Sequence, residues 1–307
     1  MLEVFSVKNV TIRVPATTAN LGPGFDCLGM ALDIWNEIHF HLGESPAVNV
    51  MGYGAGELST NTDNLVYQAS TRYLKEFGSG DISFSITCDN GIPLSRGLGS
   101  SSAAIVGGVL GASVLAGEKD PDMEALLRMA VDIEGHPDNV VAALFGGCQI
   151  VVEEEGALLH QAIPLAKDFS AVLFIPDIPM PTVEARSVLS EHITMDDAVY
   201  NLGRVALLVN SLKTGETDFL RVATKDRLHQ PPREKIFPSM PLLLRSAVNA
   251  GAFGAFLSGA GPTILAITDS KELTVAYEIA DTADKLGISG EIKVAKVSSQ
   301  GAHISEE

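Results

Sequence analysis

The sequence predicts an α+β protein built from two domains. Its 307 residues are more than a single hydrophobic core usually organises. Strand-like and helix-like patterns alternate along the chain, and its last third has the order helix, strand, strand, helix, strand. With an earlier strand and helix, that order is typical of an antiparallel ferredoxin-like sheet. We therefore expect an N-terminal domain over residues 1–165 and a C-terminal ferredoxin-like domain over residues 166–307.

The N-terminal domain is expected to mix strands with helices. In ISFSITC, residues 82–88, every second side chain is apolar or a cysteine, as in a half-buried strand. Two segments have apolar residues at helical spacing, and each follows a turn marked by glycine or proline. The expected strands are residues 10–14, 29–42, 82–88 and 148–154, and the expected helices are residues 100–116 and 121–134.

The C-terminal domain is expected to begin near Asp168. Its first strand is the apolar run SAVLFIP, and two further apolar runs are separated by the glycine-rich stretch SGAGPT. No flexible linker separates the two domains, so we expect them to pack tightly. The expected strands are residues 170–176, 252–259, 262–268 and 291–297, and the expected helices are residues 184–190, 196–213, 216–223, 241–251 and 271–286.

The composition restricts the class of protein. A formal net charge of −17 argues against nucleic acid as the main partner. No apolar run approaches the ~20 residues of a membrane span, and the N-terminus lacks a continuous apolar signal core. Cys27, Cys88 and Cys148 are far apart and form no CxxC pair, which favours free thiols in a reducing compartment. We expect a soluble, cytoplasmic protein.

The stretch PLSRGLGSSSAAIVGGVLGA, residues 93–112, has the features of a phosphate site. Gly97 and Gly99 leave backbone N–H groups accessible, and Ser100–Ser102 open a helix whose dipole attracts anions. A serine hydroxyl there could also ligate Mg²⁺. The stretch is neither a Walker A loop nor a dinucleotide fingerprint. A glycine–serine helix start without a ligand is the alternative, although three serines and two glycines are poor choices for stability alone.

Three other stretches gather polar groups between apolar segments. They are PATTANLGPGFDCLG with Asn20 and Asp26, EGHPDNVVAALFGG with its polar residues 134–139, and LSGAGPTILA at residues 257–266. The first could be an ordinary turn and the third a long hairpin connection. Four polar groups within six positions at a helix start favour a functional site for the second.

A site for anions also needs positive charge. Residues 221–235 hold five of the 21 Lys and Arg residues, and a solvated basic face explains most of them. Arg233 differs because two prolines stiffen the chain just before it, which favours a positioned guanidinium. Arg186 follows a similar proline-rich segment.

These pieces together resemble the GHMP kinases, the family of galactokinase, homoserine kinase, mevalonate kinase and phosphomevalonate kinase. PLSRGLGSSSAA is similar to the second family motif, with one extra serine before the alanine, and SGAGPT is similar to the third. PATTANLGPGFDCLG, EGHPDNVVAALFGG, TVEARSVL and HQPPR resemble the homoserine kinase form of the family. The resemblance covers about residues 10–297.

The resemblance implies ATP-dependent phosphorylation of the homoserine side-chain hydroxyl, which gives O-phosphohomoserine on the route to threonine. It also implies the GHMP kinase fold, in which an N-terminal domain like domain 2 of ribosomal protein S5 binds ATP and precedes a ferredoxin-like domain. Family members are commonly dimers, so a homodimer is expected.

The resemblance also suggests roles for individual residues. Ser101 and Glu134 would hold Mg²⁺, with the choice among Ser100, Ser101 and Ser102 left open. The ATP phosphates would meet Pro93, Leu94, Ser95, Arg96, Gly97, Leu98, Gly99, Ser100, Ser101, Ser102, Ala103 and Ala104. The substrate would meet Asn20, Asp26, His136, Asp138, Asn139, Arg186, Arg233, Gly259, Gly261 and Thr263.

The substrate of such a kinase is a zwitterion, and its charges select partners. Asp26 is the candidate for the ammonium group, and Arg186 and Arg233 are candidates for the carboxylate. Asn139, Asp138 and Arg186 are the expected catalytic residues. Asp138 and His136 are expected to line the substrate site first and to serve as a base second, because the resemblance implies that the γ-phosphate can take the proton.

Two alternative functions remain open from the sequence. One is another small-molecule kinase of the same fold, with a mevalonate-type or shikimate-type substrate. The other is a non-catalytic nucleotide-binding relative, which would have lost a phosphate or Mg²⁺ residue, whereas the loop, Glu134 and both arginines are present.

Overall fold

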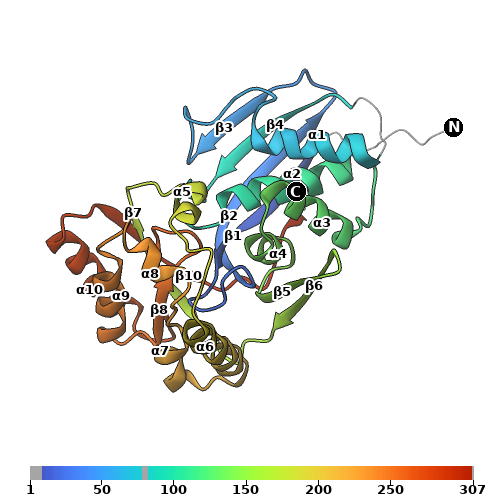
Figure 1. Ribbon diagram of the computed structural model, residues 1–307. Coiled ribbons are helices and arrows are strands. Elements are labelled where there is room, and N and C mark those ends of the chain that lie inside the picture. The colour runs from blue at the N-terminus through green and yellow to red at the C-terminus, as the bar shows by residue number, and fades with distance from the viewer. Residues whose placement is uncertain (1–8, 78–81, 306–307) are drawn as a thin grey trace.

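The computed structural model describes residues 9–77 and 82–305, which form two β-sheets with helices packed on them (Figure 1). The first sheet contains seven strands in the described part of the chain, and the second contains four. The strands of the first sheet are β1 (Asn9–Ala19), β2 (Leu28–Leu42), β3 (Val48–Gly52), β4 (Phe84–Asn90), β5 (Cys148–Glu154), β6 (Ala157–Ile163) and β11 (His303–Ser305).

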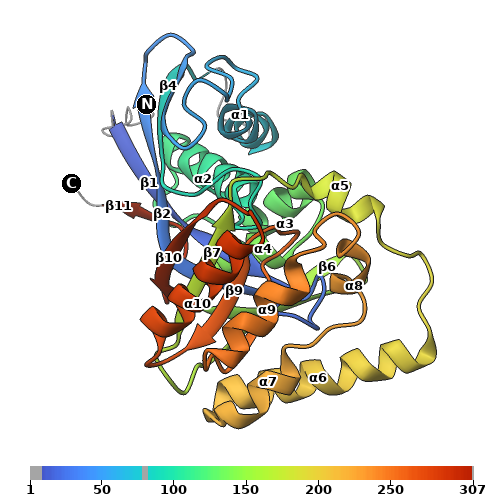
Figure 2. The same ribbon diagram turned by 90° about the vertical axis from the view of Figure 1, so that its left-hand side faces the viewer.

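The first sheet is organised around two long antiparallel strands, β1 and β2. Its order is β11-β1-β2-β4-β3, and β5 pairs with the other end of β2 and with β6. All neighbours are antiparallel except β3 and β4. Alternate side chains such as Ile12, Val14, Ile38 and Phe40 are buried, which explains the period-two pattern of the sequence. Figure 2 shows the helices of this half on one side of the sheet.

Helix α2 (Ser100–Leu115) lies at the centre of the N-terminal half. Twelve of its sixteen residues are buried, so it is apolar on nearly every side. Glycines allow its close packing: a Cβ on Gly111 would lie 2.1 Å from the Phe40 ring, and one on Gly108 would lie 2.6 Å from the carbonyl oxygen of Val66. The helices that surround it are α1 (Leu65–Phe77), α3 (Met123–Glu134) and α4 (Asp138–Phe145).

The second sheet has the order β10-β7-β9-β8, with every neighbouring pair antiparallel. In sequence order these strands are fourth, first, third and second, which is the ferredoxin-like arrangement that the sequence predicted. The strands are β7 (Ser170–Pro176), β8 (Gly254–Leu257), β9 (Ile264–Thr268) and β10 (Gly290–Lys296). The helices are α5 (Thr182–Ser187), α6 (Met195–Thr214), α7 (Leu220–Ala223), which follows the short helix η1 (Thr217–Phe219), α8 (Gln230–Arg233), α9 (Met240–Asn249) and α10 (Glu272–Lys285).

The second sheet is buried on both faces. Val172 and Phe174 of β7 pack in a cluster with α9 and α10. Ala171, Leu173 and Ile175, which alternate with them, belong to the same apolar cluster as the first sheet. The two halves therefore share a core, and the crevice between them has rigid walls.

The C-terminal tail returns to the N-terminal half. β11 pairs antiparallel with β1, placing Thr11 opposite Ser305, and Ala302 N donates to Ala143 O over 2.7 Å. The sequence assignment placed all of residues 166–307 in the second domain, whereas the described end of this segment completes the first sheet. The free edge of β1 explains the difference, since an unpaired edge strand accepts a further strand.

None of the helices in the described ranges is long and apolar enough to cross a membrane. The expectation about an N-terminal signal core lies partly outside the described residues, because residues 1–8 are not described.

Two helix glycines provide a matched test of the packing around α2. Gly203 in α6 has open space around the position of a Cβ, whereas Gly108 does not. Alanine has the higher helix propensity by about 1 kcal/mol. We expect Gly203→Ala to raise the free energy of unfolding by up to about 1 kcal/mol, and Gly108→Ala to lower it by about 1–3 kcal/mol through overpacking. Chemical denaturation measures both, and equal stabilisation by the two variants would contradict the packing described here.

Candidate active site

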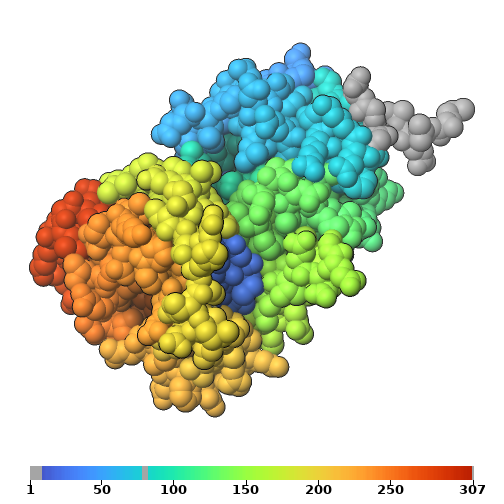
Figure 3. All heavy atoms as spheres, in the orientation of Figure 1, coloured from blue at the N-terminus to red at the C-terminus, as the bar shows by residue number. Residues whose placement is uncertain are grey.

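A cavity of about 360 Å³ lies between the two sheets and is lined by segments from both halves. Figure 3 shows the surface hollowed where the cyan residues of the first half meet the yellow-green residues around α5. The phosphate-type loop, the 20–26 loop, the α3–α4 junction, α5 and Arg233 all contribute to its wall. The topology therefore brings together every polar stretch that the sequence analysis selected.

The loop before α2 is shaped by close backbone packing. Gly97 and Gly99 have φ values of 73° and 70°, in the left-handed region that favours glycine. A Cβ on Gly97 would lie 2.2 Å from Ser258 O, and one on Gly99 would lie 1.9 Å from Thr17 Oγ1. Both positions thus require glycine for conformation and for space.

The N-terminus of α2 presents free backbone donors. No side chain caps it, and Ala103 N is the first amide bonded within the helix, to Gly99 O at 2.8 Å. The N–H groups of Ser100–Ser102 therefore have no partner within the helix, and the dipole adds positive potential there. An anion would satisfy them. Pro93, Ser102 and Ala103, which the sequence analysis included among the ATP-binding residues, do not line the cavity.

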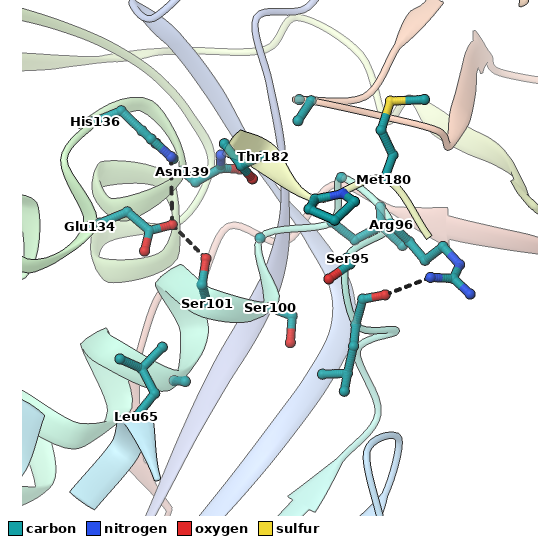
Figure 4. Close-up of a pocket in the computed structure, with 18 of the residues that line it drawn as sticks. Leu65, Ser95, Arg96, Ser100, Ser101, Glu134, His136, Asn139, Met180 and Thr182 are labelled. Carbon is teal, nitrogen blue, oxygen red and sulfur yellow. Dashed lines mark hydrogen bonds and ion pairs between the residues drawn. The ribbon is translucent and has the colours of Figure 1, made fainter. Parts of the chain in front are cut away.

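Arg96 holds this loop against the second sheet. Its guanidinium donates to the carbonyl oxygens of Pro176, Leu94 and Asp177. In Figure 4 its side chain points away from Ser100 and Ser101. Because each guanidinium nitrogen already has a carbonyl partner, Arg96 acts as a clamp on the loop. These neutral partners do not cancel its charge, so Arg96 also adds positive potential to the cavity that it lines.

Glu134 receives two serine hydroxyls at the end of α3. Ser101 Oγ and Ser102 Oγ donate to the same oxygen, Oε1, over 2.6 and 2.7 Å, and Figure 4 shows the Ser101 contact. His136 Nε2 is 3.7 Å from that oxygen. Among the described residues there is no group of three or more His, Cys, Asp and Glu side chains that could hold a metal ion. The oxygen atoms gathered here belong to two serine hydroxyls and one carboxylate.

The 20–26 loop is held in an unusual left-handed conformation. Asn20, Leu21, Gly22 and Asp26 all have positive φ. The Asn20 side chain fixes the loop, since Nδ2 donates to Gly259 O over 2.9 Å and Oδ1 accepts from Asp26 N over 3.0 Å. Asn20 lines the cavity, but both ends of its amide are engaged within the protein, so it mainly orients Asp26.

Asp26 and Arg186 pair directly with each other. Arg186 Nη2 and Nη1 donate to the two carboxylate oxygens over 2.6 and 3.1 Å, and the guanidinium lies 5.4 Å from the Phe25 ring centre. Burial lowers the pKa of Arg186, but the hydrogen bond and charge of Asp26, with the charges of Asp138 and Glu134, outweigh burial, so the pKa is raised. Sequence analysis assigned these residues to opposite ends of a substrate, and the structure shows them as a bidentate ion pair on one wall.

Arg233 is a buried cation without an acidic partner. It is 1% exposed, and among the described residues no carboxylate lies within ion-pair distance. Nε donates to Ala185 O over 3.2 Å, and Nη1 donates to Gly259 O and His229 Nδ1 over 3.0 and 2.7 Å. Burial and the charge of Arg186 lower the pKa of Arg233 to about 10, so it stays charged at neutral pH. Nη2 has no partner in the described part of the chain, and Arg233 lines the cavity.

The α3–α4 junction places three polar side chains together. Asp138 Oδ1 accepts from Asn139 N over 2.8 Å and lies 3.2 Å from His136 Nδ1. Burial lowers the pKa of His136, but the hydrogen bond and charge of Asp138, with the charge of Glu134, raise it above its ordinary value. Asn139 Oδ1 accepts from the buried Thr17 hydroxyl over 2.8 Å, so β1 fixes the orientation of this amide.

The third motif contributes less of the cavity wall than the sequence analysis expected. Gly259 and Ala260 line the cavity, but Gly261 and Thr263 do not. Thr263 is fully buried, and its hydroxyl has no hydrogen-bond partner within the described residues. Its location behind the turn reflects the pairing of Thr263 N with Arg96 O, which ties this hairpin to the loop before α2.

Several lining residues were missed by sequence reasoning. Leu58, Leu65 and Val66 supply an apolar wall, and the buried Asn36 and Asn90 also line the cavity. The helical spacing of α1 was a usable signal for Leu65 and Val66. The isolated asparagines offered none, since Asn36 lies within β2 and Asn90 at the end of β4, far apart in the sequence. Apolar side chains together with amide groups suit a heteroaromatic base.

Comparisons with known proteins agree with this geometry. The family model "GHMP kinases N terminal domain" matches residues 64–147, and "GHMP kinases C terminal" matches residues 211–286. A protein named homoserine kinase from Thermosynechococcus vestitus is 41% identical over 96% of this chain and 98% of its own length. One from Desulfitobacterium hafniense is 38% identical over 96% of this chain and 99% of its own.

Solved structures show the same fold. The crystal structure of homoserine kinase from Cytophaga hutchinsonii matches 99% of this chain and 100% of its own with a TM-score of 0.87 and 28% identity. A mevalonate diphosphate decarboxylase from Enterococcus faecalis matches 97% of this chain and 99% of its own with a TM-score of 0.68 and 14% identity, which shows the fold alone. The two-domain GHMP kinase fold expected from the sequence is confirmed, and the chain belongs to the GHMP kinase family, in its homoserine kinase group.

Proposed function

We propose that this chain is a homoserine kinase, which transfers the γ-phosphoryl group of ATP to the side-chain hydroxyl of L-homoserine. The product is O-phospho-L-homoserine, a precursor in threonine biosynthesis. The observation that supports this most is the cavity itself, which combines an uncapped helix N-terminus with a buried, unpaired Arg233 and a carboxylate, Asp26. These features suit a polyphosphate on one side and a zwitterionic amino acid on the other.

The ATP phosphates would lie against the loop before α2. Backbone N–H groups from Gly97 to Ser102 would donate to phosphate oxygens, and the α2 dipole would add positive potential. The base would occupy the compartment lined by Leu58, Leu65 and Val66. The loop lacks a lysine, and backbone donors at a helix N-terminus provide the alternative source of positive field.

The side chains around Glu134 fit Mg²⁺. The hydroxyls of Ser101 and Ser102 and the Glu134 carboxylate are hard oxygen donors, and Mg²⁺ usually completes its shell with water and nucleotide phosphates. Of the two serines that contact Glu134, only Ser101 lines the cavity, so we assign it as the ligand together with Glu134. Bound Mg²⁺ supplies positive charge that neutralises the phosphates during transfer.

Homoserine would bind through its two charged groups. Arg233 offers Nη2 and an uncompensated charge, so we assign it to the substrate carboxylate. Asp26 would accept the ammonium group while it keeps its contact with Arg186, because a carboxylate has about four acceptor sites. The pair thereby presents a ready-oriented anion, and Arg186 holds it in place.

The transfer itself forms one bond and breaks one. The hydroxyl oxygen of homoserine bonds to the γ-phosphorus while the bond from that phosphorus to the β,γ-bridging oxygen breaks, giving ADP. We assign the hydroxyl proton to a γ-phosphoryl oxygen, as the family resemblance implies. Asp138 Oδ1 is engaged by Asn139 N and His136 Nδ1, whereas Oδ2 has no hydrogen-bond partner among the described residues, so Asp138 is the alternative base that the kinetics below test. Asn139, held by Thr17, would orient the hydroxyl.

The homodimer and the cytoplasmic location stay predictions. The three cysteines are free thiols, which fits a reducing compartment.

A substrate panel tests the proposed function against its alternatives. We expect ADP release with L-homoserine and less than about one hundredth of that kcat/KM with mevalonate, galactose or shikimate, because only homoserine matches Asp26 and Arg233 together. A coupled ADP assay measures all four. Turnover of 4-hydroxybutyrate, which lacks the ammonium group, at the rate of homoserine would contradict the role of Asp26. No turnover of any substrate would favour a non-catalytic relative.

The phosphate loop is tested by two glycines with positive φ. Gly99→Ala places a methyl group 1.9 Å from Thr17 Oγ1 at a positive φ, so the loop or the buried Thr17 side chain must move, and we expect kcat/KM for ATP to fall at least about a hundredfold. Gly43→Ala has a similar φ of +83° but no atom within 4 Å, and should leave kcat/KM unchanged within about twofold. Steady-state kinetics with varied ATP distinguish the two, and a Gly99→Ala enzyme with normal ATP kinetics would exclude the proposed cradle.

The role of Asp138 is tested by kinetics of Asp138→Asn. If the phosphoryl oxygen takes the proton, kcat should fall less than about tenfold while KM for homoserine rises, because the amide preserves the size and an acceptor oxygen for His136 but removes the negative charge and the capacity to take a proton. Asp132→Asn, at an exposed position of α3 next to Arg72, is the control and should change neither constant. A loss of kcat of about a thousandfold at constant KM would assign general-base catalysis to Asp138.

A further inference from the structure

We propose that His229 is a positioning residue, which acts as an uncharged hydrogen-bond acceptor that aims the Arg233 guanidinium at the substrate carboxylate without neutralising it. The inference rests on the proposed function, because it concerns the group that would bind the carboxylate of homoserine. The sequence analysis used the HQPPR segment only for its arginine.

The surroundings of His229 determine which ring nitrogen bears the proton. The ring is 0% exposed, and Nε2 lies 2.7 Å from the carbonyl oxygen of Gly22. A carbonyl oxygen can only accept, so Nε2 is the protonated nitrogen. Nδ1 then carries the lone pair and accepts from Arg233 Nη1 over 2.7 Å.

The charge state of the ring agrees with this assignment. Burial lowers the pKa of His229 to about 4, and the charge of Arg233 acts in the same direction against the opposing effect of Asp226. His229 is therefore neutral at physiological pH. A second proton on Nδ1 would place an N–H group against the Arg233 N–H at the same position.

An uncharged acceptor can hold the Arg233 guanidinium in place without cancelling its charge. Buried guanidinium groups are usually paired with acids, which would cancel the charge that a substrate carboxylate needs. Arg233 is held instead by Ala185 O, Gly259 O and His229 Nδ1, three neutral acceptors that leave Nη2 without a partner among the described residues. Its orientation is thus fixed while its charge remains available to the cavity.

His229 also links Arg233 to the loop that carries Asp26. Gly22 belongs to that loop, and the Phe25 ring stacks on the imidazole with centres 5.3 Å apart and planes 23° apart. The Asp226 carboxylate fixes the turn that carries His229, because it accepts from the backbone N of Leu228, His229 and Gln230. The proposed ammonium and carboxylate partners of the substrate are therefore held at a set separation through one imidazole.

Three substitutions of His229 separate the effect of a hydrogen-bond acceptor near the position of Nδ1 from the effect of a negative charge there. His229→Asn places a neutral oxygen near the position of Nδ1, His229→Asp places a charged oxygen there, and His229→Gln reaches toward Gly22 O and removes the acceptor. We expect KM for homoserine within about threefold of wild type for His229→Asn, and raised at least about tenfold for His229→Asp and His229→Gln. KM for ATP should stay within about twofold in all three, and this also shows that each variant is folded.

Two results would overturn the inference. Equal KM values for homoserine in the Asn, Asp and Gln variants would show that the charge and acceptor at this position are unimportant. A parallel rise of KM for homoserine and ATP would indicate a structural role only. If His229→Asp does not fold, the Asn and Gln variants still make the comparison.

Failure of this inference can be distinguished from failure of the proposed function. If the wild-type protein does not phosphorylate homoserine, the proposed function is wrong, whatever the role of His229. The state of His229 is then tested by NMR of the ring nitrogens, using His229→Asn to assign the signal. We expect the proton on Nε2 and a bare Nδ1 from pH 6 to pH 9, and a proton on Nδ1 in this range would contradict the inference.

Discussion

The site depends on one backbone contact, where the Ser258–Gly261 turn of the second half lies against Gly97 in the loop before α2. Ser258 Oγ donates to Gly97 O over 2.6 Å, and a Cβ at Gly97 would lie 2.2 Å from Ser258 O. Gly259 continues the contact, since its N–H donates to Ala19 O and its carbonyl accepts from Asn20 and Arg233. A phosphate-type loop, a carboxylate-bearing loop and a buried arginine are thus fixed relative to one another by a few main-chain groups.

The charge distribution explains how an acidic protein can attract an anionic nucleotide. The net charge is −17, but the groups at the cavity differ from the rest of the surface. Arg233 lies among neutral acceptors, and the amides at the start of α2 lack partners within the helix. Distant acidic residues are screened over about 10 Å at 0.1 M salt, so these local donors dominate the field felt by a bound phosphate or carboxylate.

Much of the fold could be predicted because local patterns were strong. The alternation in β1, β2 and β4, and the apolar runs of β7 and β9, predicted the strands that the structure contains. β3 and β11 were missed because strands of a few residues offer little periodicity. β6 has seven residues but is buried only at Ile163, so its sequence carries little of the pattern of a buried strand. α1 was missed despite its helical spacing, and with it the apolar wall at Leu65 and Val66.

The sequence by itself determined the local chemistry: glycines where φ is positive, serines at the start of an apolar helix, and prolines before two arginines. These follow from constraints that act within a few residues. Only the tertiary structure decided which charges are compensated. Asp26 meets Arg186 across 160 positions of sequence, whereas Arg233 meets the neutral imidazole of His229. Ion pairing depends on distances of a few ångströms between side chains from separate elements, and those distances exist only after both sheets have packed.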